Sequence, residues 1–343
     1  MNETPPVRYA RTADGMDIAY CVSGSGEPVV FLPVGLTHLQ LVHRYDRRLS
    51  EWFRMMQQRF QLVQYDSRGQ GMSTRELGPD HTIGDLERDL EAVVDRLELE
   101  RFVLIGYFYL AHVAVRYAVK HPERVKGLIL ISCSVSMDAW PLDSMIGMAG
   151  RNWDGFLHNW VPTTFSPEER QELVDYYRRA RNVEDWLISA RAFSVSEISQ
   201  ELSQLRTPTL VLHPRDFLWL PSEESMKVAA SIENARFRLL DGVLPLGPPE
   251  ESVGAIEAFV AGLDGGPGKQ APADVSRGFE RLSERQLEVL KLIAEGRTTN
   301  EIAEALVLSD RTVERHIADV YAKIGARNRA EATAFALSNS DNA

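Results

Sequence analysis

The chain has 343 residues but only two cysteines, Cys21 and Cys133, which excludes a disulfide framework and a cysteine-rich metal cage. Long apolar runs are also missing. The longest stretch without a formal charge, Pro28–His43, has 16 residues and is interrupted by proline and glycine, so it is too short to cross a membrane. The first residues show neither a basic nor an apolar segment of the kind that directs secretion. We therefore expect a cytoplasmic protein with no membrane partner, and no motif suggests a cofactor or a metal.

Positive charge is scarce as well. The formal net charge is −11, which by itself argues against a nucleic-acid partner, although 44% hydrophobic and 25% charged residues are ordinary for a folded protein. Residues 277–343 contain 10 basic and 11 acidic side chains, a net charge of about −1, so residues 1–276 carry the remaining −10. A DNA-binding surface is therefore expected only in the C-terminal segment, and it depends on where the charges lie there.

The chain divides into a large part and a small one. Residues 264–276 are rich in glycine and proline and lack apolar periodicity, which predicts a flexible linker between residues 1–263 and 277–343. In the large part, apolar runs alternate with helical patterns such as Thr82–Leu97, which predicts an α/β fold with a doubly wound, mostly parallel sheet. The interval 135–200 interrupts this alternation and contains four of the six tryptophans, so a helical cap is expected there. The predicted strands are Val7–Thr12, Met16–Ser23, Val29–Leu32, Gln61–Tyr65, Phe102–Ile105, Val125–Ile131, Thr209–His213 and Phe237–Leu240.

Four motifs within residues 7–263 together resemble those of the α/β-hydrolase family. They are Phe31–Gly35 after a predicted strand, Asp66–Ser73 with its two glycines, Val103–Gly106 before a helix, and His121–Val125 before the next strand. The resemblance implies the α/β-hydrolase fold, in which ligands bind at the carboxyl ends of the parallel strands.

The residue that would act as the nucleophile is not a serine. The family presents its serine in the turn Gly-x-Ser-x-Gly. This chain has Gly106-Tyr107-Phe108-Tyr109-Leu110, with Phe108 in the nucleophile position. Because no serine has to be presented, we expect the strained turn to relax.

The acid and the histidine of a catalytic triad are replaced in the same way. Phe217 stands at the acid position, Asp216 lies one residue too early, and Val243 occupies the place of the histidine. Serine–histidine–acid catalysis needs a nucleophile, a base and an acid in contact. We therefore predict that the domain is not an enzyme.

Three other side chains offer no substitute for the triad. Cys133 follows a predicted strand near the cleft, but no histidine is placed to activate it, so a buried, inert thiol is expected. His38 and His112 are interpreted as hydrogen-bonded structural histidines rather than as polar groups of a pocket.

Apolar and aromatic side chains replace the catalytic groups, which predicts a cleft for a small, largely apolar ligand. Methionines of the cap, Met137, Met145 and Met148, are available to close it. The alternative is that these large side chains fill the cleft and leave no room for a ligand. The predicted ligand-binding residues are Gly35, Leu36, Phe108, Tyr109, Trp140, Trp153, Phe217, Trp219, Val243 and Leu246.

The C-terminal segment shows the start and stop signals of four helices. A capping box opens the first at Ser283, and this helix ends at Gly296. The others are expected at Thr298–Leu306, Asp310–Ile324 and Arg329–Leu337. Two short helices joined by a tight turn, with arginines on the outer face of the second, predict a helix-turn-helix. The third helix is expected to bury Val313, Ile317, Val320, Tyr321 and Ile324.

This segment closely resembles the LuxR-type helix-turn-helix domain from Leu282 to Leu337, with Asn300–Ala303 and Thr312–His316 among the matching stretches. The resemblance implies that the third helix enters the major groove of a double-stranded DNA operator. It also implies that the fourth helix pairs two copies in a homodimer, and RNA polymerase is a further candidate partner. Arg315 is expected to contact a base, with Glu314 and Ala318 on the same face, and Arg311, Thr312 and Lys323 are expected to contact phosphates.

The preferred interpretation is a DNA-binding transcriptional regulator whose catalytically inactive α/β-hydrolase-like domain senses a small, largely apolar ligand. Two alternatives stay open. The first is an enzyme with different chemistry in the same cleft, tethered to a DNA-binding tail. The second is a regulator whose first domain only dimerises or recruits protein partners.

Overall fold

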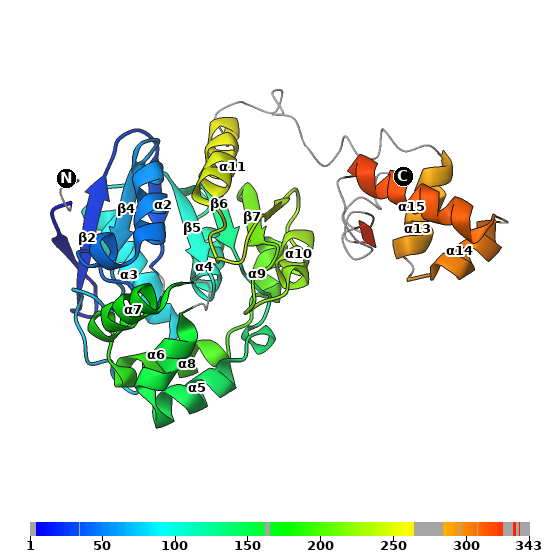
Figure 1. Cartoon of the computed structure of the whole chain (residues 1–343). Helices are drawn as coiled ribbons and strands as arrows, with labels where there is room; N and C mark the ends of the chain where they lie inside the picture. Colours follow the sequence, from blue (N-terminus) through cyan, green and yellow to red (C-terminus); the bar gives the residue numbers. More distant parts are fainter. Residues whose placement is uncertain are drawn as a thin grey trace. The chain divides into compact units, whose positions relative to one another are not determined.

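The structure is a computed structural model that describes residues 5–33, 35–161, 165–263, 284–294, 296–306 and 308–324, together with residues 332, 333 and 336. The chain forms two compact units, residues 1–264 and 265–343, which are described separately (Figure 1). In the part of the chain that is described, no helix combines the length and the hydropathy that a membrane span requires.

The larger unit is built on a sheet of eight strands, counted over the described residues, in the order β1-β2-β4-β3-β5-β6-β7-β8. The pairs β1–β2 and β2–β4 are antiparallel, whereas all pairs among β3 to β8 are parallel. The predicted mostly parallel sheet is therefore confirmed, and each predicted strand is present within two residues of its expected bounds. The strands are β1 (Arg8–Arg11), β2 (Asp17–Ser23), β3 (Pro28–Phe31), β4 (Gln61–Tyr65), β5 (Phe102–Tyr107), β6 (Val125–Ile131), β7 (Thr209–Pro214) and β8 (Arg236–Leu240).

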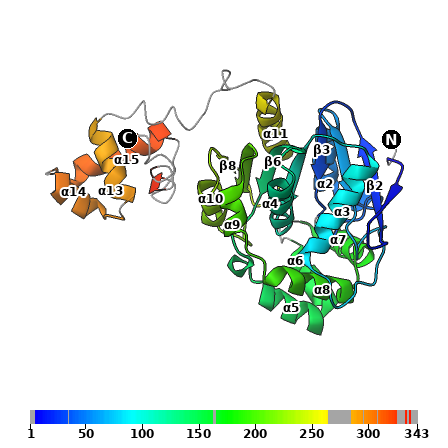
Figure 2. The same ribbon diagram turned by 180° about the vertical axis from the view of Figure 1, so that it is seen from behind.

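Helices cover both faces of the sheet, because successive side chains of each strand point to opposite faces. In β5, Val103 and Ile105 belong to one hydrophobic cluster and Leu104 belongs to another. Figures 1 and 2 show the two helical layers from opposite sides. One layer contains α2 (Arg47–Gln57) and α11 (Pro249–Leu263), and the other contains α3 (Ile83–Arg96), α4 (Leu110–Lys120) and α10 (Ser222–Ala230).

The predicted helical cap is present between β6 and β7. Its helices lie beyond the edge of the sheet at which the parallel strands end (Figure 1). A capping box between Ser166 and Glu169 begins the longest of them. The cap contains η1 (Met137–Ala139), α5 (Leu142–Arg151), α6 (Trp153–Trp160), α7 (Pro167–Ala180), α8 (Val183–Ser194) and α9 (Ser199–Gln204); the short α1 (Val42–Tyr45) follows β3.

The smaller unit has the predicted helix-turn-helix. Its described helices are α13 (Glu284–Ala294), α14 (Thr299–Leu306) and α15 (Asp310–Ile324), which confirms the expected order of short helices. The predicted linker and most of the predicted fourth helix, Arg329–Leu337, lie outside the described residues. The described core consists of Val289, Leu290, Ile293, Ile302, Ala303, Val313, Val320, Ala332 and Ala336, with Ile317 and Tyr321 packed against it.

The ends of these helices follow the predicted capping signals. The amide of Thr298 donates to Glu301 Oε2 at 2.7 Å, and the amide of Glu301 donates to Thr298 Oγ1 at 3.4 Å. Gly296 has φ +81°, a left-handed conformation that ends α13. Ser309 Oγ accepts from the amide of Thr312 at 3.3 Å and thereby caps α15. The Ser283 cap and the Ile324 side chain lie outside the described residues.

Replacing Gly106 with alanine is expected to destabilise the larger unit. A Cβ atom at Gly106 would lie 2.6 Å from Ala114 Cβ and 2.8 Å from Ala111 Cα, so α4 would have to move away from β5. Overpacking of this kind costs about 1–3 kcal/mol. A matched control is Gly254→Ala in α11, where a Cβ would meet nothing within 4 Å and where alanine is the better helix former. Urea unfolding of the full-length variants measures both effects; equal stability of the two variants would contradict the close approach of α4 to β5.

Candidate ligand cavity and nucleic-acid interface

The turn between β5 and α4 keeps the left-handed backbone of a nucleophile elbow. Phe108 has φ +54°, although an aromatic residue rarely adopts this conformation. Its amide donates to the Ile131 carbonyl at 3.1 Å, and its carbonyl accepts from the Ala111 amide at 3.0 Å. The expectation that the turn would relax without a serine is therefore wrong. Hydrogen bonds to β6 and to α4, together with the close packing at Gly106, hold the strained residue in place.

Aromatic rings meet where the resembled family would carry its catalytic groups. The Phe108 ring stacks on Phe217 with ring centroids 5.4 Å apart and meets Trp140 edge-on at 5.0 Å. Phe217 is buried, whereas the neighbouring Asp216 is exposed to solvent. The carboxylate that lies one residue early along the chain is thus on the surface, and a phenyl ring takes its place beside Phe108.

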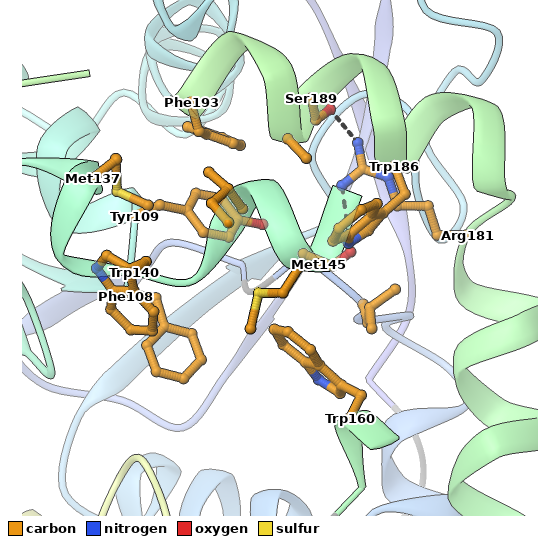
Figure 3. Close-up of a pocket in the computed structure, with 14 residues that line it drawn as sticks. Phe108, Tyr109, Met137, Trp140, Met145, Trp160, Arg181, Trp186, Ser189 and Phe193 are labelled. Carbon is orange, nitrogen blue, oxygen red and sulfur yellow. Dashed lines mark hydrogen bonds between the residues drawn. The ribbon is translucent and has the colours of Figure 1, made fainter. Parts of the chain in front are cut away.

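A cavity of about 40 Å³ lies between the carboxyl ends of the strands and the cap (Figure 3). Because one water molecule needs a cavity of about 10–15 Å³, this cavity has room for only a few groups of that size. It is lined by Gly35, Leu36, Phe108, Tyr109, Met137, Trp140, Leu142, Met145, Trp160, Arg181, Trp186, Ser189, Ala190 and Phe193.

Half of the predicted ligand-binding residues line this cavity: Gly35, Leu36, Phe108, Tyr109 and Trp140. The other five do not line it. Phe217 lies against Phe108, Trp219 lies against Trp160, Trp153 packs on Phe156 and Trp186 within the cap, and Val243 and Leu246 are half-buried in the segment after β8.

The sequence interpretation missed the polar side of the cavity. Arg181 follows the last turn of α7 and is only 4% exposed, and Ser189 lies on α8. The guanidinium donates to the Gly35 carbonyl at 3.3 Å, to the Asp185 carbonyl at 3.0 Å and to Ser189 Oγ. An arginine at the end of an amphipathic helix is ordinarily solvated, so no local pattern marks Arg181 as buried.

His112 and Cys133 occupy structural positions, whereas the buried Nδ1 of His38 has no hydrogen-bond partner among the described residues. His112 is fully buried, with Nδ1 2.7 Å from Ser196 Oγ and Nε2 3.0 Å from the Ser134 carbonyl, and burial lowers its pKa to about 4. Burial also lowers the pKa of the half-buried His38. The buried thiol of Cys133 has its pKa raised by burial to about 12, which makes it a poor nucleophile.

In the smaller unit, α15 presents part of the predicted DNA-contacting set to solvent. Glu314, Arg315 and Ala318 are exposed, opposite the buried stripe that contains Val313 and Val320. Thr312 is half-buried, with its Oγ1 2.8 Å from Ser309 Oγ at the helix cap. The side chains of Arg311 and Lys323 lie outside the described residues.

Comparison with known proteins assigns both units to families. Residues 280–336 match the family described as "Bacterial regulatory proteins, luxR family", and residues 35–193 match the Ndr family. The chain is 33% identical over 206 residues to the putative carbamate hydrolase RutD of Caulobacter vibrioides, covering 54% of this chain and 75% of that protein. It is 23% identical over 257 residues to a non-heme haloperoxidase of Rhodococcus erythropolis, covering 68% of this chain and 91% of that protein.

Solved structures show the same fold for the larger unit. The crystal structure of a bromoperoxidase from Bacillus anthracis aligns with a TM-score of 0.62 at 18% identity, covering 75% of this chain and 98% of that one. The chain therefore belongs to the α/β-hydrolase family and carries a C-terminal LuxR-type helix-turn-helix domain. Both resemblances predicted from the motifs are confirmed.

Acidification is expected to weaken the folding of the larger unit through His112. Its pKa is about 4 in the folded protein and about 6.5 when unfolded, so the neutral form stabilises the fold. This contribution is complete above pH 6.5 and is lost as the pH falls toward 4. The stability difference between the wild type and His112→Gln should therefore shrink by about 1 kcal/mol per pH unit between pH 6 and 5. The same substitution at the exposed His158 is the control, and a pH-independent difference for His112→Gln would contradict the prediction.

Proposed function

We propose that this protein is a DNA-binding transcriptional regulator whose α/β-hydrolase domain has lost catalysis and senses a small, largely apolar ligand. The observation that carries the proposal is the stack of Phe108 on Phe217 beneath a capped apolar cavity, in a chain that also contains a LuxR-type domain. This arrangement suits the binding of a ligand without its chemical conversion. We place the regulator in the cytoplasm, where its operator DNA would be.

Loss of catalysis follows from the chemistry of the side chains at the elbow. Phe108 occupies the position that presents the nucleophile, but a phenyl ring can neither attack a carbonyl nor exchange a proton. Phe217 lies where a carboxylate would orient the base, and Asp216 is exposed. The named relatives include a putative carbamate hydrolase and a haloperoxidase, so an enzyme with other cleft chemistry is the competing function that the experiment must separate.

The volume of the cavity links ligand binding to a change of shape. A cavity of about 150 Å³ accommodates a benzene ring, whereas this one measures about 40 Å³. A ligand of aromatic size therefore has to displace cap side chains, of which Met137 and Met145 are the most adaptable. Because the ligand would bind only the opened form, it shifts the population between two forms of the domain.

The same small volume favours a second candidate function. If the cavity never opens, the larger unit acts only as a dimerisation or recruitment module for protein partners. The two functions differ in one measurable respect, which is whether small molecules stabilise the folded protein.

DNA recognition is assigned to the exposed face of α15. Arg315 is the described basic side chain on this face, with Glu314 beside it and Ala318 one turn further along. We assign base contact to Arg315 and phosphate contact to Arg311, Thr312 and Lys323. Pairing of two copies into a homodimer and contact with RNA polymerase are parts of the same proposal, by analogy with the LuxR-type domain.

Thermal unfolding of the full-length protein with a panel of small aromatic acids, lactones and esters tests ligand sensing. A ligand at about 100 times its Kd stabilises the fold by about 2.7 kcal/mol, which raises the Tm by a few degrees. We expect a selective, saturable shift without consumption of the compound, and a weaker shift in Trp140→Ala, whose indole lines the cavity. Trp153→Ala is the matched control because Trp153 packs within the cap and does not line the cavity. Turnover of the compound would indicate an enzyme, and no shift across the panel would favour the recruitment module.

Arg315→Ala is expected to remove operator preference. One bidentate contact between arginine and guanine contributes about 1–3 kcal/mol of discrimination, or roughly tenfold to a hundredfold in relative affinity. Operators selected from random DNA by the full-length protein provide the probe for a gel-shift titration against unrelated DNA. Lys291→Ala is the control because Lys291 is exposed on α13 and not on α15. Unchanged specificity in Arg315→Ala would remove Arg315 from the base contacts.

A further inference from the structure

Arg181 is the charged residue among those that line the cavity, and its charge is poorly compensated. Its hydrogen bonds go to two backbone carbonyls, of Gly35 and Asp185, and to two neutral hydroxyls, of Ser189 and Tyr109. Its Nε atom is buried and has no hydrogen-bond partner among the described residues. No described carboxylate lies within 4.0 Å of the guanidinium, and burial lowers the pKa of Arg181. A buried cation of this kind is costly unless an anion pairs with it.

The carboxylate nearest along the chain is committed elsewhere. Asp185 Oδ1 accepts from the Leu77 amide at 2.7 Å, and Oδ2 accepts from the Glu76 amide at 3.2 Å and from Asn182 Nδ2 at 2.9 Å. These bonds fix the start of α8 to the segment after β4. The Asp185 carboxylate therefore favours the charged form of Arg181 from a distance, but it does not form an ion pair with the guanidinium.

A second buried arginine in the same domain shows the usual solution. Arg68 is 3% exposed, and its guanidinium contacts Asp14 and Asp89, each at 2.7 Å. Both arginines are almost fully buried, but Arg68 has three carboxylates within 4.0 Å, the third being Asp85 at 3.7 Å. The fold thus pairs the Arg68 guanidinium with carboxylates, whereas it leaves the Arg181 guanidinium without one among the described residues.

A smaller cavity of about 10 Å³ continues the polar side of the first. The two cavities share Tyr109, Arg181, Ser189 and Phe193 in their walls. The smaller one is also lined by Ser67, whose Oγ is buried and has no hydrogen-bond partner among the described residues. Its volume suits a single oxygen-sized group. The apolar cavity therefore ends in a pocket with unused donors on two sides.

We propose that the ligand of this domain is an amphipathic monocarboxylate, whose carboxylate pairs with the Arg181 guanidinium and whose apolar body lies against Trp140, Met145 and Trp186 (Figure 3). The proposal rests on the ligand-sensing function proposed above and specifies the chemistry of the ligand. A guanidinium offers a planar fork of donors that matches a carboxylate, and charge-assisted bonds of this type are about twice as strong as neutral ones.

The surroundings favour a single negative charge over a dianion such as phosphate. The Arg181 guanidinium supplies one positive charge, and the neighbouring donors, Ser189 and the Tyr109 hydroxyl, are neutral. Arg68 also lines the smaller cavity, but Asp14 and Asp89 neutralise its charge. Burial raises the pKa of Tyr109 to about 12, so its phenol stays protonated and able to donate. The remaining walls are mostly indole, phenyl, thioether and aliphatic groups, which exclude water and strengthen a single ion pair.

Matched acid and amide probes test this proposal on the full-length protein. Phenylacetate and phenylacetamide have nearly the same shape but differ in charge, as do benzoate and benzamide. Because the acid gains a charge-assisted interaction, we expect its Kd, from titrated thermal shifts, to be at least about tenfold lower than that of the amide. Arg181→Met should abolish the difference between acid and amide, and Arg181→Lys should restore part of it because the positive charge returns. Arg178→Met, three residues earlier on α7 and exposed, is the control and should keep the wild-type preference.

The possible outcomes distinguish a failure of the carboxylate assignment from a failure of the ligand-sensing function. Equal stabilisation by acid and amide, in the wild type and in Arg181→Met, would overturn the carboxylate assignment and leave the sensor intact. Absence of stabilisation by every matched pair, while a lactone or an ester still raises the Tm, would overturn the carboxylate assignment alone; absence of stabilisation across the whole panel would overturn both. Retention of the acid preference in Arg181→Met would place the anion elsewhere. Should Arg181→Met fail to fold, Ser67→Val and Arg181→Lys compared with the wild type still report the preference, which has to fall in both.

Discussion

The close approach of α4 to β5 is the constraint on which the candidate site depends. Gly106 lacks a side chain at the point where Ala111 and Ala114 of α4 pass over the strand, so the chain has to turn sharply between strand and helix. That turn places Phe108 at φ +54°, and hydrogen bonds to β6 and within α4 hold it there. The elbow geometry is thus a property of the packed sheet and helix. It is present although the side chain that it presents is a phenyl ring.

The aromatic packing at the floor of the cavity depends on this turn. The ring that it projects stacks on Phe217 and meets Trp140, which brings the end of β5, the segment after β7 and the first turn of the cap into contact. Aromatic packing thus forms the floor of the cavity at the carboxyl ends of these strands. Such packing contributes stability and removes polarity, so the polar character of the cavity is concentrated on its cap side, at Arg181 and Ser189.

Charge is distributed unevenly along the chain. Residues 1–276 carry a net charge of −10, yet the wall of their cavity contains an arginine, whereas residues 277–343 are nearly neutral. In the smaller unit, Arg315 and Glu314 alternate in sign on the exposed face of α15, so its attraction for DNA comes from position more than from net charge. The acidic larger unit opposes non-specific contact with DNA and thereby favours contact through the helix-turn-helix.

Local patterns in the sequence determined where the strands lie along the chain, the described helices of the smaller unit and the resemblance to both families. Periodicity, capping residues and short motifs act over a few neighbouring residues, so a short stretch of sequence carries these signals. They also indicated several of the aromatic residues that lie at the cavity, such as Phe108 and Trp140. The conformation of Phe108, the volume of the cavity and the burial of Arg181 were decided by the tertiary structure. Each depends on contacts between segments far apart in the chain: β5 against α4 and β6, the cap against the strand ends, and α7 against the segment after β3. A left-handed residue, a nearly filled cavity and an unpaired guanidinium are all consequences of non-local packing, for which no short stretch of sequence carries a signal.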